Sequence, residues 1–311
     1  MKKNKTIKIL ASILLALSLT GCTKTLKDGK QTVQNPETGQ NLVSNILCQP
    51  ENELTIDLYK QHNVEIDNLP KCKDFKISST GYEGIWTTLF VKPLALIIIK
   101  LGNLVKNYGL AVIILTLLIR LIMYPITKKT AMQSENMKKA KPELDKLEKK
   151  YNGKTDQESM MQKSQEMMVI YKKHNINPLS GCLFSFIQIP LFFAFYEALN
   201  RLPAIFEETL LGFQLGTSPL TAMKNGNFLY IIFIILVTLT TIFSFKLNQT
   251  ASMNSEQEKQ MKMMMNMSVI FIGIASFTMS TGIELYWIFN SGFTIIQNLL
   301  VKRRGKNANV I

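Results

Sequence analysis

The sequence predicts an all-α membrane protein with five transmembrane helices, a cytoplasmic helical hairpin and a short interfacial helix. Of its 311 residues, 47% are hydrophobic, and these gather into long blocks instead of following a soluble helix or strand period. The basic residues, which give a formal net charge of +14, lie mostly beside those blocks. That placement indicates orientation in a membrane and argues against nucleic-acid binding.

Residues 1–21 have the pattern of a signal peptide. Four lysines precede the apolar run Ile9 to Leu19, which is too short to span a bilayer comfortably. The segment closes with Leu19-Thr20-Gly21-Cys22, which resembles the lipobox of bacterial lipoproteins. We therefore expect a lipid-anchored chain, acylated (palmitate) at Cys22 on the extracytoplasmic side. An uncleaved anchor with an incidental cysteine is the alternative.

The next residues, 22–84, are polar and broken by glycines and prolines. They predict a small or partly disordered extracytoplasmic segment. Cys48 and Cys72 both fall here, where a disulfide could persist, and a bridge and two free thiols stay open as alternatives. Residues 85–101 are apolar with interspersed lysines, including Lys92, and predict an interfacial helix lying flat on the membrane.

The first span is expected at about 104–125, with Pro125 at its end. It contains Arg120, which costs about 3 kcal/mol at a bilayer centre and is therefore rarely there by accident. Thr116, Arg120 and Tyr124 are four residues apart and form a polar stripe on one helix face. From this helix alone, two interpretations stand. The stripe faces a wet cavity, or Arg120 snorkels to the interface.

Residues 127–177 are rich in lysine, which places them in the cytoplasm. Two helical stretches flank the turn signal Asn152-Gly153, and Thr155 is the expected cap of the second. The methionines of that second helix could form a docking arm for nascent chains, or they could glue the two helices together. The second interpretation is preferred for most of them, and His174 is expected to be a solvated cation.

The remaining spans are expected at about 183–200, 228–246, 268–280 and 283–301, followed by a cytoplasmic tail at 305–311. Basic residues flank every end that this order places in the cytoplasm. Glu284 is expected at the outer interface. The fourth span is short, which would let the bilayer thin locally.

No pattern in the chain indicates an enzyme. There is no phosphate-binding Gly-x-x-x-x-Gly-Lys-Ser/Thr loop, and no nucleophile–base pair or paired carboxylates turn up. With two histidines and four scattered cysteines, no metal-ligand spacing exists. We therefore expect no metal and no cofactor. A channel or small-solute transporter that uses Arg120 as an anion site is the competing class, but it would be supported by inverted repeats that the sequence lacks.

The chain from about residue 84 to residue 304 resembles the YidC/Oxa (SpoIIIJ-type) membrane protein insertases, in the lipoprotein form of Gram-positive bacteria. The resemblance rests on Thr116 to Pro125, Asn177 to Cys182 with Gln188-Ile189-Pro190, and Leu285-Tyr286-Trp287 with Asn290 and Gln297. It implies an insertase and chaperone of the bacterial plasma membrane. Its implied partners are nascent membrane proteins and the lipid bilayer, with the Sec translocon, the signal recognition particle receptor and the ribosome as candidates.

The resemblance also implies a hydrophilic groove, open to cytoplasm and lipid, with Arg120 as its arginine. Thr116 lies one turn away and Trp287 contributes to the wall, and we expect Tyr124 and Gln188 to line the same groove. Many family members carry proline where this chain has Phe184, Ser268 and Ser280, and glutamine near the end of the third span, where Ser244 is the nearest polar residue.

Overall fold

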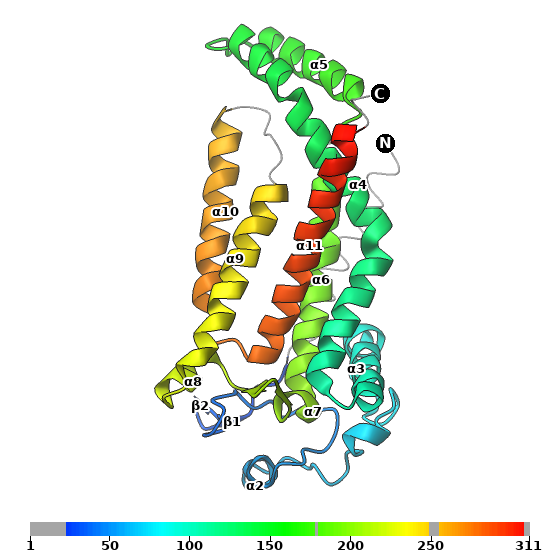
Figure 1. Cartoon of the computed structure of the whole chain (residues 1–311), viewed down its shortest axis with the longest axis vertical. Coiled ribbons are helices and arrows are strands. Elements are labelled where there is room, and N and C mark those ends of the chain that lie inside the picture. Colours follow the sequence, from blue (N-terminus) through cyan, green and yellow to red (C-terminus); the bar gives the residue numbers. More distant parts are fainter. Residues whose placement is uncertain (1–22, 178–179, 249–254, 308–311) are drawn as a thin grey trace. The chain divides into compact units, whose positions relative to one another are not determined.

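The structure is a computed structural model that describes residues 23–177, 180–248 and 255–307 (Figure 1). It is mostly helical, and the strands of the described residues are confined to two short antiparallel hairpins. The predicted α-helical class is therefore confirmed. The predicted signal peptide, the lipidation site Cys22 and residues 308–311 of the tail lie outside the described residues.

The chain divides into two compact units, and each is described by itself. The first unit comprises residues up to 119, 186–237 and 273–290, and the second comprises 120–185, 238–272 and from 291 onward. The long helices α4, α6, α9, α10 and α11 each contribute residues to both units.

Residues 23–84 of the first unit form a small ordered segment, which is the first of the two alternatives that the sequence left open. It holds β1 (Lys27–Asp28), β2 (Gln31–Thr32), α2 (Glu53–Gln61) and a 3-10 turn (Cys72–Asp74). Its apolar side chains are too dispersed along the chain to show a period, yet they meet in one core. The buried members of this core are Leu26, Val33, Leu42, Val43, Ile46, Tyr59 and Ile66.

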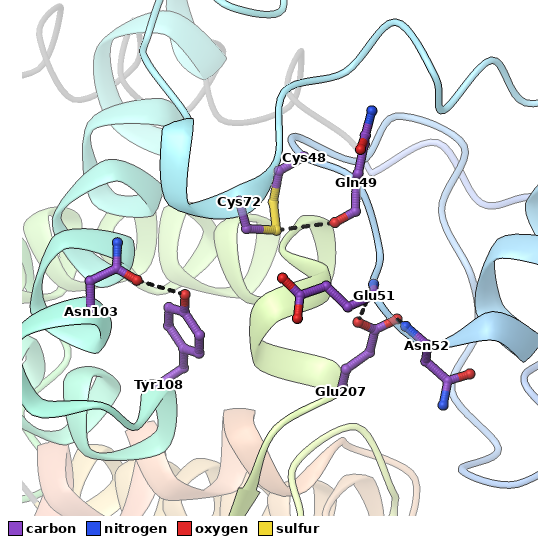
Figure 2. Close-up of a disulfide and its surroundings, with 8 residues drawn as sticks. All are labelled: Cys48, Gln49, Glu51, Asn52, Cys72, Asn103, Tyr108 and Glu207. Carbon is purple, nitrogen blue, oxygen red and sulfur yellow. Dashed lines mark hydrogen bonds between the residues drawn. A yellow bond between two sulfur atoms is a disulfide. The ribbon is translucent and has the colours of Figure 1, made fainter.

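Cys48 and Cys72 form a disulfide, which settles the alternative left open by the sequence (Figure 2). Beside it, the Glu207 carboxylate accepts hydrogen bonds from the backbone N–H groups of Glu51 and Asn52 at 2.8 and 3.2 Å. Burial raises the pKa of the Glu207 carboxyl, and these two bonds lower it in part. The Glu207 bonds tie the segment to the chain that follows α6, and the disulfide cross-links the segment within itself.

A π-helical turn (Thr87–Val91) leads into α3 (Lys92–Val105), which ends where Lys106 adopts a left-handed backbone with φ of 56°. The stretch Thr87–Val105 is one of three in the described residues that are long and apolar enough to cross a membrane, by length and composition only. The Lys92 side chain on this helix is fully buried.

Helix α4 (Tyr108–Lys150) runs for 43 residues without a break, so the first helix of the hairpin, expected from about Ala131, continues directly from the helix of the first expected span. Both Pro125 and Pro142 lie inside it. The Thr127 hydroxyl donates to the carbonyls of Met123 and Tyr124, each at 3.2 Å, in the turn that contains Pro125. These side-chain bonds add to the backbone bonds of the turn at the proline, and the helix continues past it.

Helix α5 (Gln157–Lys173) packs against the second half of α4 (Figure 1). The shared core comprises Met137, Ala140, Leu144, Tyr171 and Ile176. Asp156, and not Thr155, caps α5 by accepting the Ser159 N–H at 2.8 Å. The expected turn is present, with Gly153 at φ of 77°, a conformation that glycine adopts without strain.

The rest of the described chain is helical apart from one hairpin. Helix α6 (Ser180–Arg201) is followed by α7 (Pro203–Phe206), the strands β3 (Thr209–Leu210) and β4 (Phe213–Gln214), and α8 (Pro219–Lys224). A 3-10 turn (Phe228–Tyr230) then leads into α9 (Ile231–Asn248), which precedes α10 (Ser255–Ala275) and α11 (Thr281–Asn307). Helix α10 begins at Ser255, well before Ser268, where the fourth span was expected to start. In the described residues, the stretches long and apolar enough to cross a membrane are Thr87–Val105, the helix Tyr108–Lys150 and Phe228–Leu247.

Candidate functional site

The apolar half of α4 is inverted relative to a helix of a soluble protein. Thr116 and Arg120 are buried, with exposed fractions of 1% and 6%. Leu121 and Ile122 on the same helix are exposed, at 58% and 74%. In water, the exposed leucine and isoleucine would lose the stabilisation that burial gives apolar side chains. In a bilayer these side chains contact lipid, and the polar side chains lie inside the protein.

The five predicted groove residues are divided between the two units. Thr116, Gln188 and Trp287 belong to the first, and Arg120 and Tyr124 belong to the second. Thr116 and Arg120 lie one turn apart on the same helix and are both buried. Tyr124, Gln188 and Trp287 are each half-buried.

Trp287 of α11 belongs to an aromatic contact with α6 in the first unit. Its ring lies edge-on to Phe192, with centroids 5.3 Å apart and an interplanar angle of 86°. Next to it, Tyr286 stacks on Phe195 with centroids 4.5 Å apart. Aromatic pairs in these geometries favour a fixed mutual orientation. These two contacts therefore hold α6 and α11 together around Trp287.

The second unit has a polar interior formed by α4, α9 and α11. Thr127 of α4 donates a hydrogen bond to Gln297 Oε1 of α11 at 2.8 Å, and both side chains are buried. Further buried polar side chains come from the same three helices, namely Arg120, Ser134, Thr241, Ser244, Ser291 and Asn298. Their apolar neighbours are exposed instead, including Phe243 at 53% and Ile296 at 61%.

Sequence reasoning found part of this polar interior. Arg120 was identified as a cavity candidate and Gln297 as part of a motif, while Thr127, Thr241 and Asn298 were missed. The available signal was weak. Single hydroxyl and amide groups in apolar helices can also bond to their own backbone, so a polar residue alone does not reveal a shared interior.

The first unit contains a buried cluster of charges that the sequence did not predict. Arg201 pairs with Glu197 at 3.0 Å and also with Glu83, and Glu83 pairs with Lys92 at 3.3 Å. Trp86 Nε1 donates to the Glu197 carboxylate at 3.1 Å. Both cations are 1% exposed or less. The i,i+4 spacing of Glu197 and Arg201 was the one local signal for this cluster.

Glu284 is not the interfacial carboxylate that was expected. Its side chain in α11 is fully buried, and neither carboxylate oxygen has a hydrogen-bond partner within the described part of the chain. The expectation failed because position near a turn does not determine burial. Gly282 lies under Leu215 and Ile205 here, and this packing covers the start of α11.

The methionines of α5 do not mainly glue the helices together, as the preferred interpretation had it. Met167 packs in the core shared with α4, but Met160, Met161 and Met168 are exposed at 52%, 59% and 50%. Their face is therefore available to bind a partner. His174 also differs from expectation, because its Nε2 lies 3.0 Å from the Glu143 carboxylate and is partly buried.

No group of three or more histidine, cysteine, aspartate or glutamate side chains that could hold a metal ion occurs in residues 23–177, 180–248 and 255–307. Of the three positions where many related proteins carry proline, Ser268 lies inside α10 and its hydroxyl donates to the Met264 carbonyl at 2.8 Å. Ser280 precedes α11, and the side chain of Phe184 lies outside the described part.

The chain is similar to a known family over most of its length. Residues 100–308 match the family described as 60Kd inner membrane protein. The matched region includes α4 to α11 and begins after the disulfide and the buried charges Glu83 and Lys92.

Individual relatives agree with this match. The chain is 34% identical over 223 residues to the membrane protein insertase YidC of Oceanobacillus iheyensis, covering 71% of this chain and 85% of the relative. It is 36% identical over 220 residues to membrane protein insertase YidC 2 of Bacillus anthracis, covering 70% and 82%. For the membrane protein insertase MisCA of Bacillus subtilis the identity is 34% over 218 residues, covering 70% and 79%.

Proposed function

The chain belongs to the 60Kd inner membrane protein family, and we propose from this membership that it is a membrane protein insertase. It would insert integral membrane proteins and help them fold, without nucleotide hydrolysis or a cofactor. Nascent membrane proteins are its substrates, and the lipid bilayer is the medium into which it releases them.

One observation carries the mechanism, namely the inverted pattern of α4. A helix that buries Thr116 and Arg120 while exposing Leu121 and Ile122 suits a polar interior surrounded by lipid. The buried pair Thr127–Gln297 supports extending that interior towards the basic end of α4. We infer that Arg120, Thr116, Tyr124, Gln188 and Trp287 line a groove open to the cytoplasm and to lipid.

Such a groove lowers the barrier to moving a polar tail across hydrocarbon. Polar walls admit water into the inner leaflet, which shortens the apolar path that the tail must cross. The Arg120 cation attracts acidic residues of the incoming tail. At 4 Å and an effective dielectric constant near 20, such a pair gains about 4 kcal/mol before desolvation is subtracted. Apolar substrate segments then leave sideways, because lipid buries their side chains.

The proposed topology has five spans formed by α4, α6, α9, α10 and α11, with α3 lying in the outer interface. The hairpin of α4 and α5 lies in the cytoplasm, where the exposed methionines of α5 would contact nascent chains or targeting partners. The Sec translocon, the signal recognition particle receptor and the ribosome are the candidate partners. Cys22 is proposed as a lipid anchor on the opposite side of the plasma membrane.

Substitution of Arg120 tests the groove. Purified full-length protein in vesicles should insert a substrate with an acidic tail at least about tenfold more slowly after Arg120→Ala, since part of the charge attraction is lost. Arg120→Lys should keep most of the rate, because a cation remains. The measurement is protection of the substrate tail from external protease.

Lys129→Ala is the matched control, because it removes an exposed cation from the same helix. A substrate whose tail carries no acidic residue should be insensitive to both changes. Equal insertion of the acidic-tailed substrate by wild type and Arg120→Ala would refute the groove role of Arg120. Solute flux through substrate-free vesicles would instead indicate a channel.

A further inference from the structure

An open pocket of about 940 Å³ lies in the first unit where the extracytoplasmic segment meets the π-helical turn and α3. Its volume is in the range of pockets that hold drug-sized ligands, about 300–1,000 Å³. The lining residues are Lys73, Asp74, Phe75, Lys76, Ile77, Ser78, Gly81, Tyr82, Thr88, Leu96 and Lys100. All but Lys100 precede the region that matches the 60Kd family.

The charge of this pocket is positive. Lys73, Lys76 and Lys100 line it against the single acid Asp74, and all four side chains are exposed. None of the three lysines has an acidic partner within 4 Å in the described residues. Lys92 on the same helix differs, since it is buried and paired. The three lysines are therefore available to an external anion.

One buried polar group also lies at this pocket without a partner. The Thr88 hydroxyl oxygen is buried and makes no hydrogen bond within the described part of the chain. A buried hydroxyl that lacks a partner is unfavourable, and an acceptor oxygen brought in by a ligand would satisfy it. The pocket wall is held in place, because the buried Lys92 ammonium donates to the Gly81 carbonyl and pairs with Glu83.

Exposed apolar side chains lie on the π-helical turn and on α3, which both contribute to the basic pocket. Leu89 and Leu104 are 62% and 77% exposed, and Tyr82 at the pocket is 74% exposed. Leu96, Lys100 and Leu104 follow one another at four-residue spacing, so they share one helix face. A ligand that fits this surface combines an anionic head with apolar chains.

We propose that this pocket binds the phosphate headgroup of an anionic phospholipid of the outer leaflet, whose acyl chains lie along Leu89 and Leu104. The lysines neutralise the phosphate and Thr88 donates to one of its oxygens. The lipid would fix the depth of α3 in the interface. The proposal rests on the proposed topology, in which residues 23–84 lie on the extracytoplasmic side of the membrane. It does not depend on the groove around Arg120.

The test measures how much phosphatidylglycerol the full-length protein retains when it is extracted from phosphatidylcholine vesicles that contain a minor fraction of it. Each lysine near an anionic lipid is worth roughly a fivefold change in affinity. The triple variant Lys73→Gln/Lys76→Gln/Lys100→Gln should therefore bind phosphatidylglycerol at least about tenfold more weakly by native mass spectrometry.

The matched control is Lys27→Gln/Lys30→Gln/Lys60→Gln, which removes the same charge from exposed positions of the same segment. It should retain phosphatidylglycerol like wild type. Equal loss in both triple variants would overturn the site, because it would indicate general charge attraction, and no loss in the pocket variant would do the same.

A second variant separates a lipid from a soluble phosphate. Leu89→Ser/Leu104→Ser should weaken phosphatidylglycerol retention severalfold while all lysines remain. Soluble glycerol phosphate at millimolar concentration should not displace the lipid. Full displacement by glycerol phosphate, together with an unaffected leucine variant, would contradict the proposal. Substrate insertion is measured on the same samples, so that a loss of lipid retention can be told apart from a loss of the function proposed for the Arg120 groove.

Discussion

At the scale of single residues, Arg201 shows how the buried charges of the first unit are stabilised. Its guanidinium donates to Glu197, to Glu83 and, at 2.6 Å from Nε, to the Asn45 carbonyl. An unpaired buried charge would be far more costly than a paired one, so these acceptors are required once Arg201 is covered. The same contacts link the extracytoplasmic segment to α6.

Arg201→Met should destabilise the protein by about 3–5 kcal/mol, because it leaves Glu197 buried without its cation. The double variant Arg201→Met/Glu197→Gln should recover a large part of the loss, since glutamine still accepts from Trp86. Unfolding in detergent micelles measures both. Lys224→Met, at an exposed position in α8, is the control. If the single and double variants are equally unstable, the charge argument fails.

At the scale of elements, the pairing of α5 with the second half of α4 relies on few apolar contacts and several exposed ion pairs. Lys150 lies 2.6 Å from Glu166 and Lys173 lies 2.9 Å from Glu143. Exposed pairs of this kind each contribute little and are screened by salt. The hairpin should therefore open more readily than the helices that surround the polar interior.

Acid should open this hairpin. The hydrogen bond from Lys150 lowers the pKa of Glu166, and the Ser159 N–H lowers the pKa of Asp156. A lowered folded pKa gives stability that is present above the ordinary value and is lost as the pH falls through the folded value. Spin labels at Lys146→Cys and Ser164→Cys should report a broader distance distribution in acid than at neutral pH.

Glu166→Gln is the control for this pH effect. The variant should already show a broader distribution at neutral pH and should change less on acidification, because one of the carboxylates with a lowered pKa is gone. A distance distribution that stays the same from neutral pH to acid in the unsubstituted chain would contradict the proposed role of these carboxylates.

At the scale of the whole molecule, the segment 23–84 is held by a disulfide, by hydrogen bonds to a carboxylate and by a buried arginine. The disulfide closes a sequence separation of 24 residues, and Glu207 and Arg201 bind the segment's backbone. A cross-link over such a loop is worth about 3 kcal/mol in the chain-entropy model. The small apolar core of the segment alone would be marginal at this size.

Cys48→Ser/Cys72→Ser should therefore raise hydrogen exchange throughout residues 23–84 while the exchange of α9 stays unchanged. Mass spectrometry of peptic fragments measures both. Cys182→Ser, which removes a thiol outside the bridge, should have no such effect. Equal protection of residues 23–84 with and without the bridge would show that their core and ion pairs are sufficient.

The predictions that succeeded rest on local patterns. The turn at Asn152-Gly153 was expected and is present. Arg120 was expected to be either buried or snorkelling, and its burial favours the cavity. In each case spacing along one element, or the turn preference of one dipeptide, contains the needed information.

The predictions that failed depend on neighbours distant in sequence. The hairpin helix was expected to begin near Ala131, but α4 continues through Pro125, where Thr127 bonds to the carbonyls of Met123 and Tyr124. Glu284 was expected at the outer interface, but packing at Leu215 and Ile205 covers the start of α11. The sequence left partial disorder of the segment 23–84 open because its apolar residues have no period, although they converge in space.

The order of apolar blocks and basic flanks is enough to identify a helical membrane protein and to single out Arg120, because the cost of a charge in a long apolar helix is local. Only the tertiary structure decides that Cys48 pairs with Cys72, that Arg201 joins Glu83 to Glu197, and that three lysines surround one pocket. Each of these depends on distances between residues far apart in the chain, which no local pattern contains.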